Sequence, residues 1–250
     1  MKVAIIGGGH IGGACALGLC DKVQVTVTAR TEATLAKYAG TSVLTTLDNA
    51  GAAGDADIVI FSVKTAQMAD AVDSVAGLLE GKIVVSMAAQ VNPAAMQEML
   101  GPGIELAYAI PNTAAALKQS MTFLSNVSAT EESMQTLRRL FELLGKVCVV
   151  PMDMLPAGIS LASCGIGYAL KYISAASEGG AALGFSREDA VGIVTQTVLG
   201  AACVQNASAD SPEDEVRKVA TPGGLTEKGV RAMDEAGFTK AVIAGLCPES

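Results

Sequence analysis

The chain opens with an apolar, strand-like run that leads into a glycine-rich turn: Lys2-Val3-Ala4-Ile5-Ile6-Gly7-Gly8-Gly9-His10-Ile11-Gly12. Gly7, Gly9 and Gly12 have the spacing of the dinucleotide-binding fingerprint. There the first glycine permits a tight turn, the second lets a pyrophosphate approach, and the third lets helix and strand pack closely. A small-residue helix pattern, residues 13–20, follows. We therefore expect a nucleotide site with its phosphates at this helix N-terminus.

The residues after the second strand pattern, 23–28, bear on which dinucleotide binds. An NAD site usually carries an acid there to hold the ribose hydroxyls. This chain has Thr28-Ala29-Arg30-Thr31 and no acid before Glu32. Arg30 suits a 2′-phosphate, although it could also be a solvated loop residue. The sequence favours NADPH and leaves NADH possible. The cofactor residues predicted from these two stretches are Gly7, Gly9, His10, Ile11, Gly12, Arg30 and Thr31.

Composition restricts the class of protein. Half of the 250 residues are hydrophobic and 17% are charged, so we expect much of the chain to be buried, some of it between subunits. The net charge of −8, with no basic run, argues against nucleic acid as a partner. The N-terminal apolar run could also be a secretory signal or a membrane span. It is too rich in glycine and too short for either, so we expect a soluble, cytoplasmic protein.

Cysteine and histidine are arranged without a metal-binding pattern. The six cysteines include no C-x-x-C pair, and His10 is the single histidine. A zinc site needs more than this. The sequence therefore predicts no metal and reduced, mostly buried thiols.

Strand and helix patterns alternate over the first 150 residues. The expected strands are residues 3–6, 23–28, 58–63, 83–87, 105–110, 122–124 and 147–150, with helices at 67–79 and 131–144 among those between them. This alternation predicts an α/β fold, a Rossmann-type doubly wound and mostly parallel sheet, over residues 1–151. After Pro151 the strand patterns stop, and capping residues at Ser186 and Ser211 begin helices. We expect residues 152–250 to form an all-helical domain.

A second glycine motif lies near the C-terminus: Val219-Ala220-Thr221-Pro222-Gly223-Gly224-Leu225-Thr226. Proline and two glycines predict a tight turn, and the residues from Thr226 onward predict a helix start. Free N–H groups at such a start attract a carboxylate or phosphate. Thr226 could equally be an ordinary N-cap of that helix.

These motifs together resemble the pyrroline-5-carboxylate reductase family over nearly the whole chain. The matching segments are Ser62-Val63-Lys64-Thr65, Val85-Ser86-Met87-Ala88-Ala89, Pro111-Asn112-Thr113, residues 180–185, residues 196–201 and, most specifically, residues 220–226. Three departures mark a divergent branch. The family's Ser-Gly-Ser-Gly-Pro-Ala-Tyr reads Ala162-Ser163-Cys164-Gly165-Ile166-Gly167-Tyr168, an arginine is absent before Pro111, and His10 replaces an asparagine.

The resemblance implies reduction of 1-pyrroline-5-carboxylate to L-proline, by hydride transfer to the ring C=N. A protonated imine is already electrophilic, so orientation and charge complementarity matter more than a strong acid. By likeness, the N–H groups of Gly223, Gly224, Leu225 and Thr226 would hold the substrate carboxylate. The Thr226 hydroxyl would bond the ring nitrogen as the catalytic group, and Thr221 would line the pocket.

The resemblance also adds cofactor residues and a partner. It places Asn49 at the adenosine end and Val63, Lys64 and Ala88 along the nucleotide. It implies a homodimer, or a higher homo-oligomer, formed through the helical domain, whose apolar faces would otherwise stay exposed. Two alternatives remain open at this point. One is a reductase of another cyclic imine or of a keto or hydroxy acid, and the other is a non-catalytic NADP-binding sensor.

Overall fold

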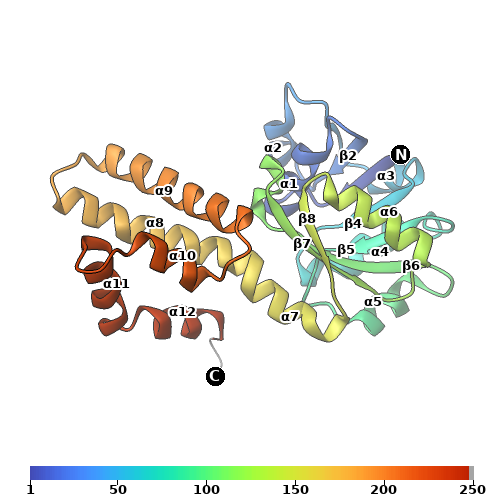
Figure 1. The fold of residues 1–250 in the computed structure, drawn as a ribbon. Helices are drawn as coiled ribbons and strands as arrows, with labels where there is room; N and C mark the ends of the chain where they lie inside the picture. Colours follow the sequence, from blue (N-terminus) through green and yellow to red (C-terminus); the bar gives the residue numbers. More distant parts are fainter. Residues whose placement is uncertain (248–250) are drawn as a thin grey trace. The chain divides into compact units, whose positions relative to one another are not determined.

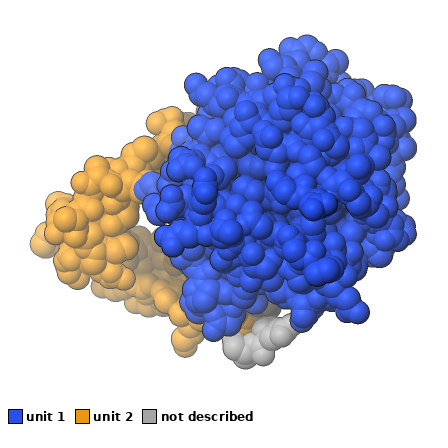
Figure 2. Space-filling view, turned by 90° about the vertical axis from the view of Figure 1, so that its right-hand side faces the viewer, with its two compact units in different colours: residues 1–163 blue, residues 164–250 orange. Residues whose placement is uncertain are grey.

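A computed structural model describes residues 1–247. Their contacts form two compact units, residues 1–163 and residues from Cys164 onward, which Figure 2 colours separately. Each unit is described by itself below. The compact units divide at residue 163, so residues 152–163 lie in the first unit. The domain boundary at residue 151 stays a prediction.

The first unit is built on one sheet of eight strands in the order β3-β2-β1-β4-β5-β6-β7-β8 (Figure 1). The strands are β1 Lys2–Ile6, β2 Gln24–Thr28, β3 Leu44–Thr46, β4 Ile58–Phe61, β5 Ile83–Ser86, β6 Glu105–Ile110, β7 Ser120–Asn126 and β8 Gly145–Val149. Every neighbouring pair is parallel except β6 and β7, which are antiparallel. The predicted doubly wound, mostly parallel sheet is confirmed.

Helices cover both faces of this sheet. They are α1 His10–Leu19, α2 Glu32–Leu35, α3 Asn49–Gly54, α4 Met68–Asp73, α5 Pro93–Leu100, α6 Glu131–Glu142 and the short α7 Leu155–Gly158. Short 3₁₀ turns lie at Ala36–Tyr38, Thr65–Gln67, Thr113–Leu117 and Met152–Met154.

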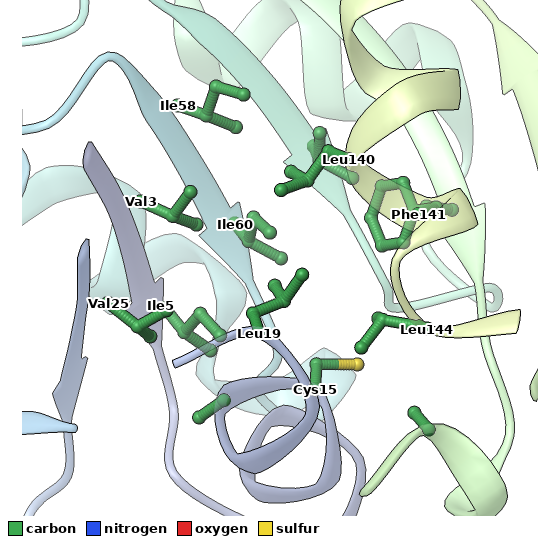
Figure 3. Packing of buried hydrophobic residues seen from close by; sticks show 14 of the residues in the cluster. Val3, Ile5, Cys15, Leu19, Val25, Ile58, Ile60, Leu140, Phe141 and Leu144 are labelled. Carbon is green, nitrogen blue, oxygen red and sulfur yellow. The ribbon is translucent and has the colours of Figure 1, made fainter. Parts of the chain in front are cut away.

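Alternate residues of each central strand enter two separate cores. Val3 and Ile5 of β1 pack with Leu19 of α1 and Phe141 of α6 in one core (Figure 3). The intervening residues of β1 belong to the other core, with residues of α3, α4 and α5. Burial on both faces explains why the central strands are continuously apolar rather than alternating.

The described residues of the second unit form helices and no strand, as predicted. Its helices are α8 Gly165–Ala182, α9 Arg187–Ala207, α10 Pro212–Val219, α11 Leu225–Glu235 and α12 Phe238–Leu246. The expected caps are present: Ser186 Oγ accepts from the Asp189 N–H, and Ser211 with Asp214 forms a reciprocal capping box. A π-helix, Ile159–Cys164, leads into α8 and contains part of the altered 162–168 segment.

Three sequence expectations need correction. The helix predicted at 67–79 is a 3₁₀ turn followed by α4, which ends at Asp73; the chain then turns through Gly77, whose φ is +76°. Strand β3 was not predicted, because its three residues show no alternation of apolar and polar side chains. The thiols are not mostly buried, because only Cys15 is fully enclosed and Cys148, Cys164, Cys203 and Cys247 are exposed.

One helix of the described chain, α9, is long and apolar enough to cross a membrane by length and composition alone, and only 6% of its apolar window is buried within the chain. Other exposed large hydrophobic side chains lie on α8 and α12, for example Leu170, Tyr172 and Ile243. The unpartnered apolar surface therefore extends beyond α9 to several helices of the unit.

Candidate functional site

The glycine turn between β1 and α1 has the geometry that its sequence predicts. Gly7 has a φ of +109°, and a Cβ there would lie 2.4 Å from the Ser62 carbonyl oxygen. A Cβ on Gly12 would lie 2.2 Å from the Gly7 carbonyl oxygen. At Gly9, by contrast, a Cβ would meet nothing within 4 Å. Gly7 thus permits the turn, Gly12 permits close packing, and Gly9 leaves backbone open to a ligand.

Two side chains of the segment after β2 form hydrogen bonds with the backbone of the glycine turn. The Tyr38 hydroxyl donates to the Gly8 carbonyl at 3.2 Å, and the Lys37 ammonium donates to the Gly9 carbonyl at 2.9 Å. Burial, with a smaller contribution from Cys15, raises the pKa of Tyr38 to about 12, so the phenol remains a donor at neutral pH. These bonds fix the carbonyls on one side of the turn. The first N–H groups of α1 have no intrahelical acceptors and stay available for phosphate oxygens.

A hollow of about 620 Å³ opens beside this turn. It lies at the carboxyl ends of β1, β2 and β4, where ligands bind in open parallel sheets. The lining residues are Ile6, Gly7, Gly8, Gly9, Thr28, Ala29, Arg30, Thr31, Thr34, Leu47, Asn49, Ser62, Val63, Lys64, Gln67, Asp70 and Ala71.

The hollow brings together most of the predicted cofactor residues. Seven of them line it: Gly7, Gly9, Arg30, Thr31, Asn49, Val63 and Lys64. The other four, His10, Ile11, Gly12 and Ala88, do not. His10, Ile11 and Gly12 belong to the first turn of α1, and Ala88 follows β5, where its N–H donates to Ser86 Oγ at 3.3 Å.

Several lining residues were not predicted. Ser62 follows β4 directly, so the rule that ligands bind at strand carboxyl ends could have found it. Thr34, Gln67 and Asp70 lie on short helices or turns just outside the quoted motifs, and nothing local in the sequence marks them. Gln67 contacts Arg30: with its carboxamide oxygen facing the guanidinium, that oxygen lies 2.8 Å from Nη1 and 3.0 Å from Nη2.

These features fit a dinucleotide. The volume lies within the usual range for cofactor pockets, roughly 300–1,000 Å³. The open backbone at Gly9 and the first turn of α1 suit a pyrophosphate. No acid stands at the end of β2, whereas Arg30 lines the hollow there. The acid that does line it, Asp70, comes from α4.

The second glycine motif forms a turn that opens α11. Gly223 has a φ of +74°, and Gly224 is the N-cap residue, with its N–H donating to the Thr221 carbonyl at 2.9 Å. Thr226 is therefore the second residue of the helix. The alternative interpretation of Thr226 as an ordinary N-cap is wrong, because Gly224 takes that position and makes no side-chain cap.

The N–H of Gly223 already has a carboxylate partner. It donates to Oε2 of Glu227 at 2.7 Å, from one turn along the same helix. The N–H groups of Leu225 and Thr226 lie in the first turn of α11, where intrahelical acceptors are missing. The Thr226 side chain is exposed. The turn thus has the donors to bind a small carboxylate, and at Gly223 a carboxylate is bound.

No described residues form a cluster of three or more histidine, cysteine or acidic side chains able to hold a metal ion. The two motifs lie in different compact units. The hollow belongs entirely to the first, and the Thr221–Thr226 turn to the second.

Two separate parts of the chain match models of known families. Residues 2–90 match the family model described as NADP oxidoreductase, coenzyme F420-dependent. Residues 153–247 match the model described as pyrroline-5-carboxylate reductase dimerisation. Among curated proteins, pyrroline-5-carboxylate reductase of Vibrio alginolyticus is 31% identical, over 98% of this chain and 93% of the relative. Pyrroline-5-carboxylate reductase 1 of Dictyostelium discoideum is also 31% identical over 99% of this chain, which spans about half (48%) of that relative.

Solved structures show the same fold. A pyrroline-5-carboxylate reductase from Coxiella burnetii is 25% identical with a TM-score of 0.88, covering 98% of this chain and 94% of that one. The Plasmodium falciparum pyrroline carboxylate reductase, solved with NADP bound, has the same TM-score and the same coverage at 19% identity. At that identity the second likeness concerns the fold alone.

Proposed function

Because the chain belongs to the pyrroline-5-carboxylate reductase family, we propose that it reduces 1-pyrroline-5-carboxylate to L-proline, the last step of proline biosynthesis. NADPH is the preferred hydride donor in this proposal, and NADH a weaker one. The observation that carries it is the Thr221–Thr226 turn, whose glycines open α11 with backbone donors able to hold a substrate carboxylate.

The turn would bind the substrate at two points. The N–H groups of Gly223, Gly224, Leu225 and Thr226 would hold the carboxylate, which suits the positive end of a helix dipole. Since the Gly224 N–H donates to Thr221 and the Gly223 N–H to Glu227, substrate binding would need these contacts to loosen. Leu225 and Thr226 need no such change.

Thr226 would act at the ring nitrogen. Its hydroxyl is exposed at the second position of α11 and is not used as a cap. There it would hold the proton that the nitrogen carries in the iminium form and keeps in proline. Thr221, whose carbonyl closes the turn, would line the pocket. NADPH, when bound, supplies the hydride to the ring carbon of the C=N bond.

The cofactor would lie in the hollow beside the first glycine turn. Gly9 and the first turn of α1, with His10, Ile11 and Gly12, would receive the pyrophosphate. Asn49 would lie at the adenosine end, Val63, Lys64 and Ala88 along the nucleotide, and Arg30 with Thr31 at the 2′-phosphate. The Asn49 amide donates to Ser74 Oγ at 2.9 Å, which orients its side chain.

We also propose that the active protein is a soluble, cytoplasmic homodimer or higher homo-oligomer. The match of residues 153–247 to a dimerisation model supports this, as do the exposed apolar side chains on α8, α9 and α12. A second subunit would cover the apolar surface of α9, so no lipid contact is needed to explain it.

The test is oxidation of NADPH by the purified protein with 1-pyrroline-5-carboxylate, in wild type, Thr226→Ala and Thr226→Ser. We expect kcat to fall at least tenfold in Thr226→Ala, with NADPH affinity unchanged, because the hydroxyl at the ring nitrogen is lost together with the methyl group. Thr226→Ser keeps a hydroxyl and should retain most activity. Equal activity in all three proteins would remove Thr226 from the mechanism.

A second candidate is reduction of another cyclic imine or of a keto acid. The altered residues Ala162–Tyr168 favour it, because this segment keeps only one glycine, Gly165, and the tyrosine of the family pattern, and part of it forms the π-helix. A panel of imines and keto acids in the same assay decides between them. Binding of NADPH without turnover of any substrate would instead indicate a nucleotide sensor.

A further inference from the structure

Gln67 and Arg30 form a side-chain pair among the residues that line the hollow. Arg30 follows β2 and is exposed, while Gln67 ends the 3₁₀ turn after β4 and is half-buried. The Gln67 carboxamide oxygen accepts from both terminal nitrogens of the guanidinium, at 2.8 Å from Nη1 and 3.0 Å from Nη2. The opposite amide orientation would place N–H donors against N–H donors, so the oxygen must face the guanidinium.

This contact uses the edge of the guanidinium formed by its two Nη atoms and leaves another edge free for a ligand. A guanidinium presents five N–H donors in a planar fork. One oxygen that contacts both Nη atoms occupies the end of the fork. The edge formed by Nε and one Nη remains for a second partner. That edge matches two oxygens of a phosphate, the geometry for which arginine is preferred over lysine.

The chemical nature of residue 67 matters as well as its position. A neutral carboxamide orients the guanidinium without cancelling its charge, whereas a glutamate there would neutralise Arg30 and repel a phosphate. The other charged groups lining the hollow are Lys64, which adds positive charge, and Asp70, which opposes it. Because Asp70 offsets the charge of Lys64, the net positive charge that favours a dianionic group comes from Arg30, provided that no acid neutralises it.

We propose that Gln67 is a positioning residue that holds Arg30 ready for the 2′-phosphate of NADPH and so contributes to the preference for NADPH over NADH. This rests on the proposed cofactor and not on the identity of the imine. Because an oriented arginine loses less side-chain freedom on binding, affinity for the phosphate rises without any contact between Gln67 and the ligand.

The test measures binding of adenosine 2′,5′-bisphosphate and of adenosine 5′-monophosphate by calorimetry. Gln67→Met keeps the length and packing of the side chain and removes the acceptor. We expect its affinity for the bisphosphate to fall about 3- to 10-fold, the loss of one or two hydrogen bonds in a partly exposed site, with no change for the monophosphate. Gln67→Glu should lose at least as much. In enzyme assays the KM for NADPH should rise while kcat and the KM for NADH stay the same.

Arg30→Lys and the double variant complete the design. If Gln67 acts through the guanidinium, Gln67→Met should have no further effect in the Arg30→Lys background. Equal weakening of both nucleotides in Gln67→Met would mean a general structural role and would overturn the proposal. So would a wild type that fails to prefer the bisphosphate. Failure to turn over any imine, with the nucleotide results as expected, would count against the reaction only.

Discussion

Gly223 shows how a single backbone donor can control access to a binding turn. Its N–H is bonded to the Glu227 carboxylate at 2.7 Å, and both residues are exposed. A substrate carboxylate that uses the same donor must displace this one, and the two negative charges repel. Glu227 is therefore expected to act as an internal competitor for the proposed substrate.

We expect Glu227→Ala to lower the KM for 1-pyrroline-5-carboxylate about 3- to 10-fold, because the Gly223 N–H becomes free and a negative charge is lost. The kcat should change little, since Glu227 does not act at the ring nitrogen. Steady-state kinetics with saturating NADPH measures both values.

Glu227→Gln separates charge from shape. Its carboxamide can still accept from Gly223 but does not repel the substrate, so an intermediate KM is expected. A KM that rises in Glu227→Ala would show that Glu227 supports the turn instead of competing for it.

At the residue scale the sequence predicted the motifs but not all their contacts. The roles of Gly7 and Gly12 follow from their spacing, because only glycine fits those two positions. The contact between Arg30 and Gln67 could not be predicted, since it depends on β2 and β4 both flanking β1 and ending at one edge. The hydrogen bond from Gly223 to Glu227 was not predicted for a different reason. It is a local contact, but it forms only because the helix begins after Gly224 and not at Thr226.

At the scale of elements, α1 packs against the 3₁₀ turn Thr113–Leu117 through a glycine. A Cβ on Gly18 would lie 2.2 Å from the Ala115 carbonyl oxygen and 2.5 Å from a Leu144 methyl group. The first of these is backbone and cannot rotate away. The helix that carries the nucleotide turn is thus positioned by contact with the segment between β6 and β7.

Gly18→Ala should lower the free energy of unfolding by about 1–3 kcal/mol, because overpacking exceeds the gain in helix propensity. Chemical denaturation followed by circular dichroism measures the change. Gly54→Ala is the matched control, because Gly54 also lies in a helix and a Cβ there meets nothing within 4 Å. It should be neutral or slightly stabilising. Equal stability of the two variants would contradict the packing argument.

Glu105 joins β6 to the start of α6. Its carboxylate accepts from the Thr130 N–H at 2.7 Å and from the Ser133 hydroxyl at 2.6 Å. Desolvation alone would raise the pKa of Glu105, but the hydrogen bonds from Ser133 and Thr130 together outweigh it and leave the pKa lowered from 4.5. The folded protein therefore favours the ionised form.

This shift predicts a pH-dependent contribution to stability. A folded-state pKa below that of the unfolded chain stabilises the protein at pH values above the unfolded pKa, and this contribution is lost as pH falls through the folded pKa. Glu105→Gln should lower the free energy of unfolding by about 1 kcal/mol at about pH 7, and the difference from wild type should shrink towards about pH 3. Glu80→Gln, at an exposed turn, is the control. A difference that does not vary with pH would exclude the ionised carboxylate as its cause.

Elements with strong patterns were predictable, and those set by tertiary contacts were not. Helix α6 has its apolar residues at helical spacing and begins at the predicted residue. Strand β3 is three residues long and mostly exposed, so burial left no pattern in its sequence. The antiparallel β7 follows β6 after a short connection, which leaves no room for the crossover that a parallel strand needs.

At the scale of the whole molecule, the second unit buries few apolar side chains within the single chain. Ala190 is its one buried hydrophobic residue among those described, whereas large apolar side chains such as Leu170, Leu199 and Ile243 are more than half exposed. The close contact of α8 with α9 at Gly180 and Ala190 forms one interface. In the proposed assembly a second copy covers the remaining apolar faces, and the match to a dimerisation model supports this.

Leu199→Glu tests this on α9, where Leu199 is 56% exposed in the single chain. Burying a carboxylate in an apolar interface costs several kcal/mol, so the variant should dissociate, and light scattering should give the mass of a single chain. Imine reduction should be lost because the helical unit is no longer supported. Binding of adenosine 2′,5′-bisphosphate should persist, because the hollow belongs wholly to residues 1–163. Gln135→Glu adds the same charge at an exposed polar position of α6, in the other unit, and should keep wild-type mass and activity. A Leu199→Glu protein that keeps its mass would place the interface on other helices, and a monomeric wild type would reject the proposed assembly.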